Sequence, residues 1–78
     1  MSWNYRVIEE EYSGEKYFAV HTVFYNESGI PELVGCDPVR LEGTSIDGLK
    51  QEIIKFNSAV DKEPIKASFF IEEESDDN

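Results

Sequence analysis

The sequence contains one histidine, His21, and one cysteine, Cys36, that could act as a base or a nucleophile. Neither has a partner residue at the spacing expected for a Ser-His-Asp or Cys-His site. A strand histidine that packs or hydrogen-bonds, and an unreactive thiol, are the simpler interpretations of these two positions. We therefore expect no catalytic residues, and we expect that the chain is not an enzyme.

Metal and cofactor sites have no better support. One histidine and one cysteine cannot supply the ligands of a structural zinc site. The run Glu9-Glu10-Glu11 lies in an expected strand, which sends neighbouring side chains to opposite faces, and it lacks the spacing of a calcium-binding EF-hand loop. No glycine-rich phosphate-binding motif occurs. We expect no metal and no cofactor.

A surface for protein contact is a better candidate. Two expected strands pair as a hairpin, and one face of that hairpin is too apolar for a surface that meets only water. Tyrosine is also enriched at protein interfaces. A half-buried structural face would use the same side chains equally well. The candidate contact residues on this face are Arg6, Tyr17, His21, Val23 and Tyr25.

The net charge of the chain and the length of its apolar segments indicate which partners and which cell compartment to expect. Seventeen acidic and seven basic residues give a formal net charge of −10, which repels phosphate backbones and anionic membranes. We expect neither nucleic acid nor a membrane as partner. A single cysteine excludes an internal disulfide, and apolar runs such as Phe69-Phe70-Ile71 are far too short to span a bilayer. We therefore expect a cytoplasmic protein.

These observations leave two hypotheses about function. The first is a non-enzymatic protein-interaction module that uses the sheet face not covered by the helix and binds another protein or a second copy of itself. The alternative is an acidic inhibitor or antitoxin-like protein that blocks a basic site on a partner protein.

The expected contact face depends on a hairpin near the amino terminus. Residues 3–11 alternate in the manner of a strand, and residues 16–25 are rich in aromatic and β-branched side chains. Ser13-Gly14 forms a tight turn between them. With this pair at the tip, Glu11 faces Lys16, Val7 faces Val20, Tyr5 faces Thr22 and Trp3 faces Phe24. The face with Trp3, Tyr5, Val7, Phe18, Val20 and Phe24 is the expected core.

Three further elements follow the hairpin. Residues 32–36 form a short strand that prolines flank, so we expect it at a sheet edge. Thr44 or Ser45 caps a helix, and Asp47 has capping-box spacing from Thr44. The apolar stripe expected to lie on the sheet comprises Ile46, Leu49, Ile53, Phe56 and Val60. Residues 65–71 alternate as a last strand, expected to run parallel to a neighbour.

The predicted fold class is α+β, a two-layer β-β-β-α-β domain. Its sheet is mainly antiparallel, and one amphipathic helix covers one face. We expect residues 1–71 to form a single domain, because a chain of 78 residues has no room for a second core. Residues 72–78 contain five acidic side chains and are expected to form a disordered acidic tail.

The sequence also resembles a group of short uncharacterised bacterial proteins that open with W-x-Y-R-V-I and carry an A-I-H-x-V-Y-Y strand. The resemblance covers roughly residues 3–60, and it implies a bacterial origin and no particular activity. The chain departs from the group in its longer final strand and acidic tail. The order of elements is similar to that of HicB-like antitoxins, a likeness of topology alone. The resemblance to the group rests on Trp3-Asn4-Tyr5-Arg6-Val7-Ile8, Tyr17-Phe18-Ala19-Val20-His21-Thr22-Val23-Phe24-Tyr25, Gly29, Pro38-Val39 and Gly43-Thr44-Ser45.

Overall fold

The computed structural model describes residues 2–70, and the acidic tail expected at residues 72–78 lies outside this range. Its largest element is a long hairpin of β1 (Ser2–Tyr12) and β2 (Glu15–Tyr25). Ser13 and Gly14 both have positive φ, 53° and 83°, which is the backbone of a turn that matches the twist of the two strands. The predicted register is confirmed at every named pair, from Glu11 opposite Lys16 to Trp3 opposite Phe24.

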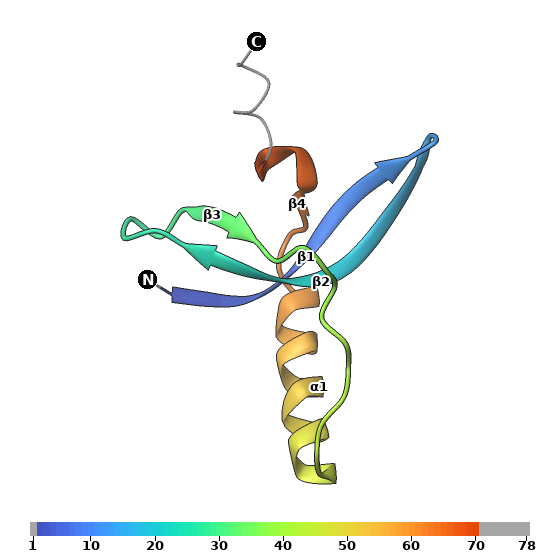
Figure 1. Cartoon of the computed structure of the whole chain (residues 1–78), viewed down its shortest axis with the longest axis vertical. Helices are drawn as coiled ribbons and strands as arrows, with labels where there is room; N and C mark the ends of the chain where they lie inside the picture. The colour runs from blue at the N-terminus through green and yellow to red at the C-terminus, as the bar shows by residue number, and fades with distance from the viewer. Residues whose placement is uncertain (1, 71–78) are drawn as a thin grey trace.

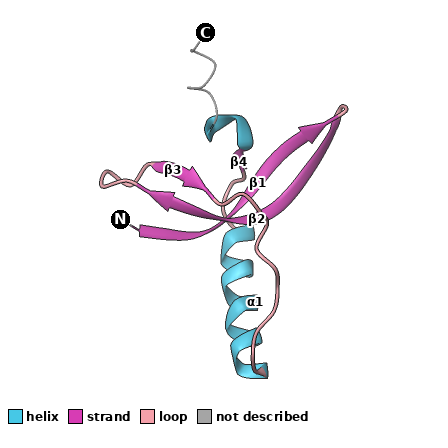
Figure 2. Cartoon of the chain, viewed as in Figure 1, coloured by secondary structure: helices cyan, strands magenta, loops and turns pink. Residues whose placement is uncertain are grey.

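The fold class is α+β, with one helix and a four-stranded mixed sheet in the order β3-β2-β1-β4 (Figures 1 and 2). β3 (Pro31–Val34) pairs antiparallel with β2 at one edge, as predicted from its flanking prolines. It ends two residues earlier than expected. The chain nevertheless continues along β2, because Gly35 N–H donates to Thr22 O and Val39 N–H donates to Val20 O, both at 2.8 Å.

The return from the helix completes the other edge of the sheet. After α1 (Ile46–Val60), β4 (Ile65–Lys66) pairs parallel with β1, opposite Ile8 and Glu9. The parallel pairing is as predicted, but the expected long final strand is wrong. Residues Ala67–Phe70 instead form a short 3₁₀ helix, η1. It lies on the side of the sheet opposite α1 and contacts both β1 and β3 (Figure 1).

The position of η1 changes which face of the sheet is buried. On the face expected to form the core, Val7 is buried, whereas Trp3 and Phe18 are both more than half exposed. On the opposite face, Ile8, His21 and Val23 are all buried. The prediction of the core face therefore holds only in part: Tyr5, Val20 and Phe24 are half-buried, and the opposite face has more fully buried residues. Both faces of the hairpin are apolar, and η1 lies over part of the one that we expected to stay open.

The helix also packs differently from expectation. Figure 1 shows α1 running away from the sheet, with its carboxyl-terminal end against β1 and β2. Ala59 is buried and Phe56 half-buried at that end. Leu49 is half-buried, but Ile46, Ile53 and Val60 of the predicted stripe are exposed. The stripe exists as a pattern in the sequence, but only part of it faces the sheet.

Candidate functional site

The five candidate contact residues do not form one open surface in the described part of the chain. Their backbone positions share one face of the hairpin, as the register requires. Their exposure nevertheless differs widely. His21 and Val23 are buried, Arg6 and Tyr25 are half-buried, and Tyr17 is exposed.

Arg6 and Tyr25 belong to a polar cluster that joins three elements. Arg6 Nη1 donates to Tyr25 Oη at 3.1 Å, and Tyr25 Oη donates to Asn4 Oδ1 at 2.7 Å. Arg6 Nη2 donates to the carbonyl of Glu63 at 2.9 Å, just before β4. Because each hydrogen bond spans distant parts of the chain, the cluster fixes the carboxyl-terminal return against the hairpin.

His21 and Val23 hold the opposite edge together. His21 Nδ1–H donates to the carbonyl of Gly35 at 2.9 Å, because a carbonyl oxygen can only accept. Val23 is fully buried and pairs with Val34 of β3. A residue that binds a partner needs exposed surface, so the structure gives these two residues a role in packing rather than in contact.

Tyr17 lies apart from the other candidates, near the far end of the hairpin. Its ring lies 5.4 Å from that of Tyr12, centroid to centroid. The Tyr12 hydroxyl donates to Glu10 Oε1 at 2.7 Å, and this hydrogen bond is the main cause that raises the pKa of Tyr12. Lys16 forms an ion pair with Glu9 at 3.5 Å. This end of the hairpin is therefore polar, acidic and open to solvent.

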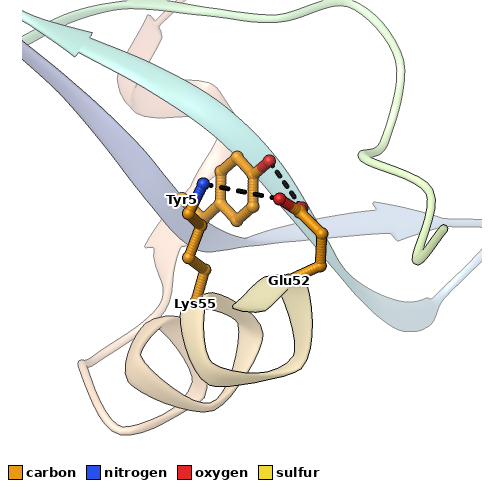
Figure 3. A network of polar contacts seen from close by, with 3 residues as sticks. All are labelled: Tyr5, Glu52 and Lys55. Carbon is orange, nitrogen blue, oxygen red and sulfur yellow. Dashed lines mark hydrogen bonds and ion pairs between the residues drawn. The ribbon is translucent and has the colours of Figure 1, made fainter. Parts of the chain in front are cut away.

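A second polar network connects the sheet to the helix (Figure 3). The Tyr5 hydroxyl donates to Glu52 Oε1 at 2.9 Å, and Lys55 Nζ contacts Glu52 Oε2 at 3.4 Å and lies 5.8 Å from the centre of the Tyr5 ring. Phe56 packs edge-on against the same ring, 5.6 Å away. Burial, and then the hydrogen bond and negative charge of Glu52, raise the pKa of Tyr5 above its ordinary value. Tyr5 thus stays neutral at physiological pH and serves as an anchor for the helix.

Metal ligands are not gathered in the described residues. Cys36 is an exposed free thiol that lies just after β3, outside the strand although we expected that strand to extend over residues 32–36. Within residues 2–70 no three His, Cys, Asp or Glu side chains come together as a metal site. No helix of that range is long and apolar enough to cross a membrane.

The largest unexplained feature is the apolar surface on the side of the helix. In the described chain, four hydrophobic residues are buried, whereas twelve large ones are exposed. We define the helix seam as Ile46, Ile53 and Val60, which are 69%, 45% and 62% exposed. At the end of the seam, Val60 lines an open hollow of about 320 Å³ with Phe18, Val7, Val20 and other residues.

The sequence contained a signal for this surface. The three seam residues are seven apart, and Leu49 and Phe56 stand three residues after the first two, which is the spacing of a short heptad pattern. We interpreted these five positions as one face against the sheet. A heptad pattern is equally typical of a helix that pairs with another helix.

Comparison of the chain with models of protein families, with curated proteins and with solved structures gives no match. The functional argument therefore rests on the residues and their arrangement.

Proposed function

We propose that this protein is a non-enzymatic protein-interaction module of the cytoplasm, and that its contact surface lies on the side of the helix. One observation carries the proposal: twelve large hydrophobic side chains are exposed in residues 2–70, whereas only four hydrophobic residues, one of them an alanine, are buried. Contiguous exposed apolar surface on a small protein is typical of an interaction site. We define the apolar surface as Phe18 together with the helix seam.

The remaining features fit this role better than catalysis. His21 is hydrogen-bonded to the carbonyl of Gly35. The thiol of Cys36 has no ion pair or hydrogen bond among the described residues. The Tyr5 phenol has a raised pKa and is bonded to Glu52, which opposes ionisation and use as a nucleophile. These groups support folding, and the exposed apolar side chains remain for binding.

The contact surface proposed here differs from the sheet face first expected. Tyr17 is the most exposed of the five candidates, but its aromatic neighbour is Tyr12, whose hydroxyl is bonded to Glu10, at the acidic end of the hairpin. Arg6 and Tyr25 are engaged with each other and with Asn4. His21 and Val23 are buried, so a partner that approached this face could not reach them.

The acidic-inhibitor alternative is favoured by the end of the hairpin. Glu9, Glu10, Glu11 and Glu15 lie there, and one ion pair with Lys16 compensates only part of their charge. Such a protrusion suits a basic cleft on a partner protein. Binding of that kind weakens steeply as salt rises, whereas apolar contact does not.

A capture experiment tests the proposal. The tagged chain is immobilised and exposed to an extract of its native cells supplemented with an untagged copy of itself. We expect specific retention of protein that survives ~1 M NaCl and is lost in Phe18→Glu. Tyr17→Glu is the matched control, because Tyr17 is similarly exposed and points to the opposite face of β2.

Two results would contradict it. Retention of nothing, neither the untagged copy nor another protein, would exclude an interaction module. Retention that low salt abolishes and that Phe18→Glu leaves intact would favour the acidic inhibitor instead.

A further inference from the structure

We infer that the partner is a second copy of this chain, and that two copies pair through antiparallel α1 helices along the helix seam. This inference deepens the proposed function and rests on it. The twofold axis passes beside Ile53, so that Ile46 of one copy lies opposite Val60 of the other. Such an interface uses the same patch on both chains, as a closed dimer requires.

The spacing of the seam is that of a helix pair. Ile46, Ile53 and Val60 occupy the same position of three successive heptads, and Leu49 and Phe56 occupy the second apolar position of the first two. In the structure the second set is half-buried under the chain's own loop and sheet, whereas the first set is exposed. Leu49 and Phe56 thus pack within the chain, whereas Ile46, Ile53 and Val60 are free to pack against a second helix.

The helix needs this additional contact. A helix of 15 residues in isolation is marginal in water, and Gly48 in its first turn weakens it further. Figure 1 shows the amino-terminal half of α1 extending beyond the sheet, accompanied only by the incoming loop. That loop approaches closely at Gly43, where a Cβ would lie 2.7 Å from Leu49 N. A second helix would bury the seam along its whole length.

Charge favours α1 as the place where two acidic chains meet. Each chain carries a formal net charge of −10, so two copies repel each other at most surfaces. The helix contains Asp47 and Glu52 against Lys50 and Lys55, so its own net charge is zero. In the antiparallel arrangement Lys50 of one copy lies near Asn57 of the other, and no like charges face each other across the seam.

The hollow at the end of the seam can accommodate a side chain of the second copy. Val60 contributes to its wall together with Phe18 of β2 and Pro64. The antiparallel arrangement brings Ile46 of the second copy to Val60, and hence to this hollow. Ile46 is the most exposed seam residue, so the arrangement buries the side chain that gains most from leaving water.

The helix seam and Phe18 supply a substantial part of the area that a dimer interface needs. From their exposed fractions, the three seam residues and Phe18 supply roughly half of the ~800 Å² that each partner buries in a standard interface. Lys50, Asn57 and Leu49 flank the seam and can contribute more.

Sedimentation equilibrium of the purified full chain tests the inference. We expect a dimer at ~10 μM, and we expect Ile53→Glu to raise the dimer dissociation constant by at least ~100-fold, because it places two carboxylates at the twofold axis. Ile54→Glu is the matched control. Ile54 is 59% exposed on the same helix but points away from the seam, so this variant should remain a dimer. Circular dichroism checks that both variants retain the helix.

Cross-linking tests the orientation in a Cys36→Ser background. Ile53→Cys should form a disulfide-linked dimer readily, whereas Ile46→Cys alone should not. A mixture of Ile46→Cys and Val60→Cys chains should give the mixed dimer. Self-linkage of Ile46→Cys as fast as that of Ile53→Cys would indicate parallel helices and overturn the arrangement.

The outcomes separate this inference from the proposed function. A wild-type chain that stays monomeric at ~1 mM overturns the dimer, as does equal dissociation of Ile53→Glu and Ile54→Glu. If such a monomer still retains another protein through Phe18 in the capture experiment, the interaction module stands and only the choice of partner is wrong. If it retains nothing, both fail.

Discussion

Tyr5 is the side chain through which the helix is attached to the sheet. Its hydroxyl donates to Glu52, and its ring meets Phe56. The neutral phenol is the form that donates, and the raised pKa means that folding favours this form. The stabilisation is therefore present below pH 10 and is lost as the pH rises through the folded-state pKa.

Replacing Tyr5 by phenylalanine should remove the hydrogen bond and keep the ring. We expect the free energy of unfolding at pH 8 to fall by about 0.5–1 kcal/mol. The difference from wild type should shrink at pH 11, where the Tyr5 phenol of the wild type begins to ionise. Urea unfolding at both pH values measures this. Tyr12→Phe should cost less, because its bond to Glu10 is exposed, and an undiminished penalty at pH 11 would contradict the assignment.

His21 tests the distinction between packing and contact. His21→Leu keeps the volume but leaves the carbonyl of Gly35 without a donor. We expect a loss of about 1–3 kcal/mol in the free energy of unfolding. Tyr17→Leu, at an exposed position of the same strand, should change stability by less than ~0.5 kcal/mol. If thermal or urea unfolding showed equal losses of stability for His21→Leu and Tyr17→Leu, the buried hydrogen bond of His21 would be contradicted.

At the scale of elements, the start of α1 depends on its cap. The sequence left Thr44 and Ser45 as alternatives, and the structure selects Ser45, whose Oγ accepts from Gly48 N–H at 2.9 Å. The helix begins at Ile46, so Asp47 lies in its first turn, where a negative charge is favourable.

Ser45→Ala should therefore destabilise the protein by about 1 kcal/mol, because one amino-terminal N–H loses its acceptor. The loss should appear in urea unfolding and as lower helicity by circular dichroism. Thr44→Ala, one residue earlier, should have little effect. A larger loss of stability in Thr44→Ala than in Ser45→Ala would show that Thr44, and not Ser45, caps the helix.

At the scale of the whole molecule, the proposed dimer and the acidic surface predict a particular response to salt. Raising the ionic strength from 0.02 M to 0.3 M shortens the screening length from about 20 Å to about 6 Å. Repulsion between two chains of net charge −10 then weakens, so the dimer dissociation constant should fall several-fold. The melting temperature should also rise with protein concentration, because only the folded chain dimerises.

Sedimentation and thermal unfolding over this salt range check the prediction. An acidic inhibitor bound to a basic partner responds with the opposite sign, since salt weakens its attraction. A melting temperature that is independent of concentration from ~1 μM to ~1 mM would contradict a dimer coupled to folding.

The sequence by itself determined the local structure. Alternation and the Ser13-Gly14 turn set the register of the hairpin, because a slip by one residue would move every side chain to the other face. Helical spacing and the prolines located the helix and the edge strand. These features depend on near neighbours, and the identities of those neighbours are visible in the sequence.

Only the tertiary structure decided which surfaces are covered. Both faces of the hairpin are apolar, so the pattern could not indicate that Ile8, His21 and Val23 would be buried while Trp3 and Phe18 stay exposed. Residues 65–71 alternate like a strand, yet residues 67–70 form η1 because the chain turns over the sheet there. The helix seam is exposed because Tyr5 and Phe56 anchor one end of α1 and direct the other away from the sheet. Packing between distant segments sets that angle, and no local pattern encodes it.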